Sequence, residues 1–123
     1  MLPNRFRVSK NAMDALKLLK SRTGITPNIL CRLALTLSLE EGKLPGRKQS
    51  ELDGGEFNAH TLFGEYERIY DCFIRQIHGP LDTRHCNLVV ADHIDRGLDH
   101  LKKCKTLLDL SQFLSKVALR TSH

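Results

Sequence analysis

The sequence predicts a mainly α fold, a small helical domain of about five helices with an N-terminal ribbon-helix-helix-like unit. Residues 5–8 alternate between arginine and apolar side chains, which is typical of a half-buried strand. Two amphipathic segments with helix-capping residues follow directly. The 123 residues are enough for one domain with its own core, so we expect a single domain over 1–123. Its parts are expected at 5–41 (ribbon-helix-helix-like unit), 42–58 (loop) and 61–119 (helical remainder).

The alternating segment would place Arg5 and Arg7 on one face and Phe6 and Val8 on the other. So short a strand leaves its backbone groups unsatisfied unless it pairs with another strand. The sequence contains no other run that resembles a strand. The segment is therefore expected to be a disordered arm or to pair with the same segment of another copy. Pairing between copies would make the protein an obligate oligomer.

The first helix is predicted to begin after Ser9, a favoured N-cap residue, and to run to about Arg22. Gly24 then supplies the left-handed conformation that ends many helices. Apolar residues recur at helical spacing along this segment. Those expected to face the core are Ala12, Ala15, Leu16 and Leu19.

The second helix is predicted over 27–41, because Thr26 is an N-cap candidate and proline is favoured at the first helical position. Apolar side chains cover most of its circumference, so we expect burial on more than one side. Such burial again favours an interface shared between copies. The inward residues are Ile29, Leu30, Leu33, Ala34 and Leu37, with Leu35 and Leu39 widening the stripe.

The segment 42–58 has the composition of a loop, with a proline, four glycines and charges of both signs. Its first half is basic and its second half acidic. The loop is either a DNA-contacting arm or a flexible connection, and composition slightly favours the connection.

Three further helices are predicted from helical periodicity, over 61–77, 83–103 and 106–119. The first should supply the aromatic part of the core. The inward residues are Leu62, Tyr66, Ile69, Phe73 and Ile77, widened by Phe63, Tyr70 and Ile74; then Val90, Ile94, Leu98 and Leu101; and then Leu107, Leu110, Phe113, Leu114 and Val117.

Positive charge is concentrated in the first 48 residues, which hold ten lysines and arginines against three acids. This asymmetry is typical of polyanion binders, although a basic solvated surface would show it too. Arginines on the outer face of a ribbon can enter the major groove or bind phosphates, and helix lysines can add phosphate contacts. The alternatives are a disordered basic arm and an ordinary solvated helix face. The candidate DNA-binding residues are Arg5, Arg7, Lys10, Lys17, Lys20, Arg22, Lys43, Arg47 and Lys48.

No catalytic motif is recognisable, since GxSxG, a phosphate-binding glycine loop and HExxH are all missing from the sequence. His93, His100 and Cys104 share a helical face and could hold zinc, but an exposed, salt-bridged face is the stronger interpretation. His85 and Cys86 are neighbours on a helix and would not face each other. We therefore expect a protein that is not an enzyme and has no metal or cofactor.

The four cysteines form no CxxC pair, and the N-terminus shows no signal peptide. No apolar run is long enough to span a membrane. We expect a cytoplasmic protein with reduced thiols.

The chain resembles the DndE proteins of bacterial DNA phosphorothioation over essentially its full length. The resemblance is carried by RFRVSKNAMDALKLLKSRTGITPNILCRLALTLSLEEG, ELDGGEFN and HTLFGEYERIY. It implies a part in the machinery that replaces a non-bridging phosphate oxygen of DNA with sulfur. It also implies a helical, ribbon-helix-helix-like subunit that forms homotetramers and binds duplex DNA, with a preference for nicked DNA. The sulfur-mobilising and ATP-using chemistry would belong to the other phosphorothioation proteins, which are its partners.

Two other functions stay open. A ribbon-helix-helix or helix-turn-helix transcription regulator would read sequence through Arg5 and Arg7. It would prefer operator over random DNA by more than about a thousandfold. A small nuclease or thiol enzyme, the less favoured alternative, would use His85, Cys86, His93 or His100.

Overall fold

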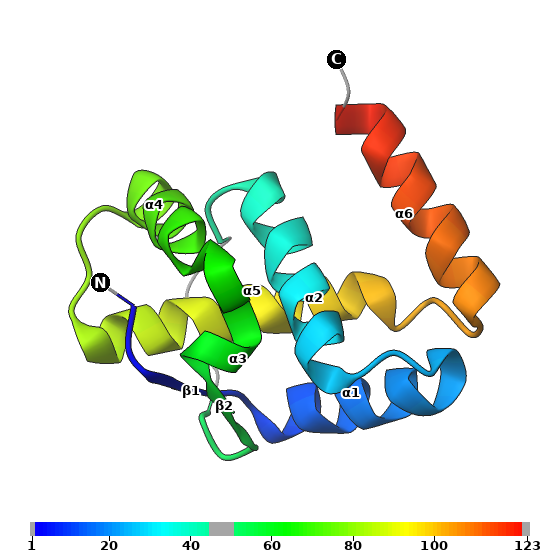
Figure 1. Ribbon diagram of the computed structural model, residues 1–123, viewed down its shortest axis with the longest axis horizontal. Helices are drawn as coiled ribbons and strands as arrows, with labels where there is room; N and C mark the ends of the chain where they lie inside the picture. The colour runs from blue at the N-terminus through cyan, green and yellow to red at the C-terminus, as the bar shows by residue number, and fades with distance from the viewer. Residues whose placement is uncertain (1, 45–50, 122–123) are drawn as a thin grey trace.

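A computed structural model describes residues 2–44 and 51–121 of the chain (Figure 1). The mainly α prediction is confirmed, with one small ribbon near the N-terminus. Within the described residues, no helix is both long and apolar enough to cross a membrane. The elements are β1 (Arg5–Arg7), α1 (Lys10–Thr23), α2 (Pro27–Glu41), β2 (Glu56–Asn58), α3 (Ala59–Phe63), the 3-10 helix η1 (Gly64–Tyr66), α4 (Glu67–His78), α5 (Thr83–Leu101) and α6 (Leu107–Thr121).

The core is built around α5, which runs across the molecule with α2 packed against it (Figure 1). Gly97 on α5 lets the two backbones meet, because a Cβ there would lie 1.8 Å from the carbonyl oxygen of Ala34. The predicted inward residues of this helix are confirmed. Val90, Ile94, Leu98 and Leu101 are all buried.

The first helix confirms its sequence prediction closely. The Ser9 hydroxyl accepts a hydrogen bond from the Ala12 amide at 3.0 Å, as an N-cap should. Gly24 adopts the left-handed conformation, with φ of 76°, and its amide donates to the Lys20 carbonyl. The four residues predicted to face the core are all buried.

The ribbon pairs within the chain, so the prediction that the N-terminal strand has no partner in its own chain is wrong. β1 and β2 are antiparallel, with Phe6 opposite Phe57 and both side chains buried. The second strand lies inside the segment predicted as loop. It is only three residues long and follows two glycines, so it carries too little alternation to be recognised.

The predicted helix over 61–77 is interrupted, because α3 ends at Phe63 and η1 intervenes before α4. The inward prediction for this segment is partly confirmed and partly wrong. Leu62, Phe63 and Ile74 are buried, and Tyr70 and Ile77 pack against the core. Tyr66, Ile69 and Phe73 are instead each about half exposed. Two apolar stripes lie side by side on this segment, and spacing alone does not tell which one meets the core.

Two further inward predictions are wrong, since Ile29 is 47% and Leu107 54% exposed. Both residues lie in the first turn of their helices, α2 and α6. Later residues of the same helices, such as Leu30 and Leu110, are buried. The apolar periodicity is therefore correct, and each helix enters the core after its first residues.

Candidate nucleic-acid interface

The ribbon presents its two arginines to solvent, as the sequence predicts. Arg5 and Arg7 are exposed while Phe6 between them is buried. The Arg5 guanidinium lies 3.7 Å from the Glu56 carboxylate across the ribbon, and both side chains are well exposed. An exposed ion pair of this kind contributes about 0–1 kcal/mol. Arg5 can therefore exchange Glu56 for a phosphate at little cost.

The outer edge of β1 is covered by α5. The Asn87 side chain accepts a hydrogen bond from the Arg7 amide at 3.2 Å and donates one to the Arg7 carbonyl at 2.9 Å. The backbone of Arg7 is thus bonded on the side away from β2. The predicted ribbon between two copies would need this edge to be free, and in this fold it is not.

The outer face of α1 carries the strongest candidates for phosphate contacts. Lys10, Lys17 and Lys20 are all exposed there. Lys17 and Lys20 form no ion pair within the described part of the chain. Arg22 is half-buried, and its guanidinium donates to the Lys102 carbonyl at 3.3 Å. The three lysines are therefore more accessible to a ligand than Arg22 is.

Acidic side chains surround the beginning of α1. The Asp53 carboxylate accepts from the Lys10 amide at 2.9 Å, and Asp95 accepts from the Ser9 hydroxyl at 2.8 Å. A pocket of about 360 Å³ beside them is lined by Lys10 and Lys102 and by four acids, Glu51, Asp53, Asp95 and Asp99. These carboxylates occupy the positive end of the helix dipole, where a phosphate would otherwise bind. Lys10 is consequently a weaker candidate than Lys17 or Lys20.

The basic residues of the loop do not join this face. Lys43 follows α2 at the end opposite to α1 (Figure 1). A helix of 15 residues is about 22 Å long, so Lys43 lies far from the α1 lysines. Arg47 and Lys48 lie outside the described residues.

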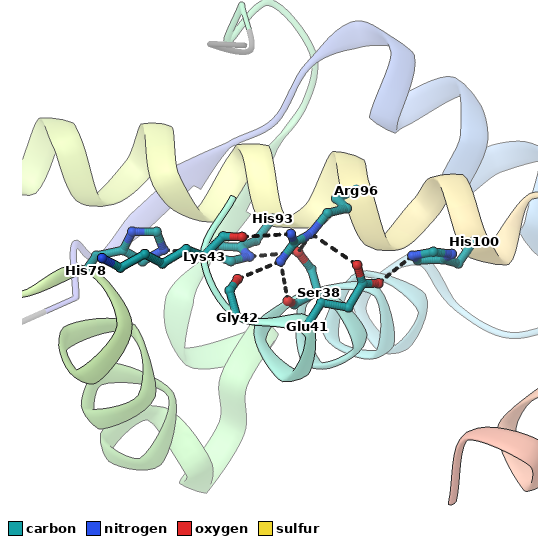
Figure 2. A network of polar contacts seen from close by, with 8 residues as sticks. All are labelled: Ser38, Glu41, Gly42, Lys43, His78, His93, Arg96 and His100. Atoms are coloured by element: carbon teal, nitrogen blue, oxygen red, sulfur yellow. Dashed lines mark hydrogen bonds and ion pairs between the residues drawn. The ribbon is translucent and has the colours of Figure 1, made fainter. Parts of the chain in front are cut away.

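A buried polar network that sequence reasoning missed joins the end of α2 to α4 and α5 (Figure 2). The Arg96 guanidinium donates to the Ser38 hydroxyl at 2.7 Å and to the carbonyls of Ser38, Gly42 and Lys43. It thereby satisfies carbonyls that the end of α2 leaves without helical partners. Glu41 pairs with Arg96 at 3.8 Å.

Arg96 can only donate, which fixes the direction of its own hydrogen bonds. The Ser38 hydroxyl therefore accepts from Arg96, and its oxygen also forms a hydrogen bond with Nδ1 of His93, 2.7 Å away. Nε2 of His93 forms a hydrogen bond with Nε2 of His78 at 2.8 Å. Burial, followed by the positive charges of His78 and Arg96, lowers the pKa of His93 from 6.5 to about 3. Burial also lowers the pKa of His78, with Lys43 and Arg96 adding to the effect.

The structure separates the residues considered for zinc and thiol chemistry. His93 is fully buried against Ser38 and His78, and His100 binds Glu41 instead. Across the described residues, no group of three or more histidine, cysteine or acidic side chains could hold a metal ion.

The neighbouring pair His85 and Cys86 diverges as well. His85 is exposed and bonded to Asp82, whereas Cys86 is buried. Burial raises the pKa of the Cys86 thiol, which keeps it from forming the thiolate that nucleophilic chemistry needs.

Comparisons with known proteins point to one family. The family model described as "DNA sulphur modification protein DndE" matches residues 5–109. The chain is similar to a solved structure of DndE from Escherichia coli B7A, involved in DNA phosphorothioation modification, at 35% identity and a TM-score of 0.74. That similarity covers 82% of this chain and 98% of the other. A glycine-to-lysine mutant of DndE is similar at 33% identity and a TM-score of 0.73, covering 82% and 99% of the two chains. No curated protein matches the chain.

Proposed function

Since this chain belongs to the DndE family, we propose that it is a non-catalytic, DNA-binding subunit of the bacterial DNA phosphorothioation machinery. It binds duplex DNA, and nicked duplex in preference to intact duplex, through the outer face of α1 with support from Arg5 and Arg7. The observation that carries the proposal is the pair Lys17 and Lys20, which are exposed on one face of α1. The other phosphorothioation proteins supply the chemistry and contact this subunit.

Binding of this kind depends on the DNA backbone more than on the bases. Lysine ammonium groups bind phosphates as point charges and release counterions, so affinity falls steeply as salt rises. The covered edge of β1 argues against the ribbon pairing of a ribbon-helix-helix regulator. We accordingly expect little discrimination between DNA sequences.

The experiment compares nicked, intact and single-stranded DNA of the same sequence at several salt concentrations. A negative slope of log K against log salt, tightest binding to the nicked duplex, and less than about a thousandfold preference among sequences support the proposal. A slope near zero contradicts backbone binding. Equal affinity for nicked and intact duplex contradicts the nick preference alone.

We also propose that the protein works as a homo-oligomer, with a tetramer expected. The exposed stripe of Tyr66, Ile69 and Phe73 lines an apolar groove of about 460 Å³ between α2 and α4. Contiguous apolar surface of this kind is uncommon on monomers, which supports assembly. The double variant Ile69→Gln and Phe73→Gln should lower the mass in solution, whereas Arg68→Gln beside the stripe should leave it unchanged. A wild-type monomer would contradict the proposal.

Our proposal assigns no catalytic step to this chain and places it in the cytoplasm, where DNA modification takes place. Burial raises the pKa of Cys31 to about 12 and also that of Cys104, so neither thiol is prepared as a nucleophile. Supercoiled plasmid incubated with the protein should remain intact. Nicking that disappears in a His85→Ala variant would instead establish the nuclease alternative.

A further inference from the structure

The helix α4 has two apolar faces, and the fold covers only one of them. Ile74 is its one buried residue, and Tyr70 and Ile77 pack partly buried against the core. Ile69 and Phe73 lie on the other face and are each about half exposed. The helix lies at the periphery of the molecule (Figure 1), so this second face is open to a partner.

The uncovered face has the spacing of a seam between two helices. Tyr66, at the end of η1, is followed by Ile69, Phe73 and Gln76 at intervals of three, four and three residues. These intervals are those of the a and d positions of a coiled coil. We call the four residues the outer stripe, and all of them line the groove between α2 and α4. The outer stripe contains no charged side chain, and depletion of charge is typical of the buried centre of an interface.

The outer stripe is polar at its two ends and apolar in the middle. Tyr66 and Gln76 are both exposed and carry the polar groups. If two such stripes pack antiparallel about a two-fold axis, Tyr66 of one copy lies opposite Gln76 of the other. Ile69 then lies opposite Phe73, so polar meets polar and apolar meets apolar. The antiparallel direction also places the positive end of each helix dipole beside the negative end of the other.

We infer that the outer stripe packs against the outer stripe of a second copy of this chain, with the two α4 helices antiparallel about a two-fold axis near position 71. This inference rests on the proposed homo-oligomer and adds the element that meets the groove and its direction. The interface is isologous and closes after two copies. A tetramer would therefore need a second, different surface to join two such pairs.

Cys72 provides an internal reporter of this arrangement. It is exposed, whereas Cys31, Cys86 and Cys104 are buried. It follows Ile69 by three residues, so it borders the outer stripe one residue from its centre. An axis near position 71 places the two Cys72 side chains on the same side of the helix pair. At the interaxial distance of packed helices, about 8–10 Å, a short linker can join them.

The test treats full-length protein with a short bis-maleimide and separates the products on a denaturing gel. Wild type should give a covalent dimer, and Cys72→Ser should give none. The double variant Ile69→Gln with Phe73→Gln keeps Cys72 and should lose the dimer, because the outer stripe no longer packs.

The matched control moves the thiol along the same side of the helix. Glu65 is exposed and lies seven residues, or two turns, before Cys72. In the antiparallel pair the two copies of position 65 are about 18 Å apart along the helices. Glu65→Cys in a Cys72→Ser background should therefore give no dimer with the same reagent.

The mass of the untreated protein in solution separates this inference from the proposed function. If wild type is an oligomer but Cys72 gives no dimer, the inference is overturned, the homo-oligomer stands on another surface, and the outer stripe is left for a different protein. A dimer formed through position 65 overturns the antiparallel direction and with it the inference. A wild-type monomer removes the homo-oligomer and the inference together.

Discussion

Gly97 is the residue on which the contact between α2 and α5 depends. Any larger side chain would place its Cβ inside the carbonyl group of Ala34, within a core that contains the fully buried Leu30 and Leu35. Backbone cannot move aside as a flexible side chain can, so the two helices would have to separate. Glycine is therefore required here for space rather than for its backbone conformation.

The substitution Gly97→Ala should lower the free energy of unfolding by about 2–4 kcal/mol, despite the better helix propensity of alanine. Urea denaturation followed by circular dichroism measures this change. Asp99→Ala, at an exposed position on the same helix, is the control and should stay within about 0.5 kcal/mol of wild type. Equal stability of the two variants would mean that α2 and α5 do not meet at Gly97.

The buried His93 should make stability depend on pH. Its pKa is 6.5 when unfolded and about 3 when folded, so the unfolded chain binds more protons between these values. The contribution of the neutral His93 to the free energy of unfolding is fully present above pH 6.5 and is lost as the pH falls towards 3. We expect this loss to lower the free energy of unfolding by about 2 kcal/mol between pH 7 and pH 5.

Urea titrations at pH 7, 6 and 5 measure this dependence. The variant His93→Gln should flatten it, because glutamine does not titrate. His60→Gln, which replaces an exposed histidine, should retain the slope of wild type. If His93→Gln keeps the full slope, His93 is not the group that binds the proton.

At the scale of elements, the helices could be predicted because their signals are local. Ser9, Gly24 and Pro27 mark helix ends by their own conformational preferences, and α2 has the predicted bounds of 27–41. The basic face of α1 could be predicted as well, since Lys10, Lys17 and Lys20 are seven and three residues apart and such spacings share a helix face. These features depend only on residues within one segment.

Other features could not be predicted, because they depend on contacts between distant segments. β2 becomes a strand only by pairing with β1, and three residues carry no clear period. The network of Ser38, His93 and Arg96 spans 58 positions and has no common spacing. Lys102 likewise joins Arg22 only after folding. A pattern search within one segment cannot find any of these.

The ribbon depends on α5 as well as on β2, and this can be tested at Asn87. The variant Asn87→Ala removes both hydrogen bonds to the Arg7 backbone. We expect a loss of about 1–2 kcal/mol in the free energy of unfolding and faster hydrogen exchange at the Arg7 amide. Asn11→Ala, at an exposed position, should change neither. Unchanged exchange at Arg7 would mean that Asn87 does not cover the strand.

At the scale of the molecule, charge is divided between surfaces. The outer face of α1 carries the exposed Lys17 and Lys20, whereas the pocket at the start of α1 is lined by Glu51, Asp53, Asp95 and Asp99. The acids repel phosphate from the groove between α1 and α5 and leave the outer face of α1 as the favourable approach. The family match ends at residue 109, so most of α6 lies beyond it.

The central claim is that the lysine face of α1 binds the DNA backbone. The most direct measurement is the affinity of Lys17→Glu with Lys20→Glu for nicked duplex as salt varies, beside the control Arg68→Glu with Lys116→Glu. Charge reversal on α1 should weaken binding at least tenfold and reduce the salt slope by about two, while the control stays close to wild type. Equal affinities and slopes for the two variants would contradict it.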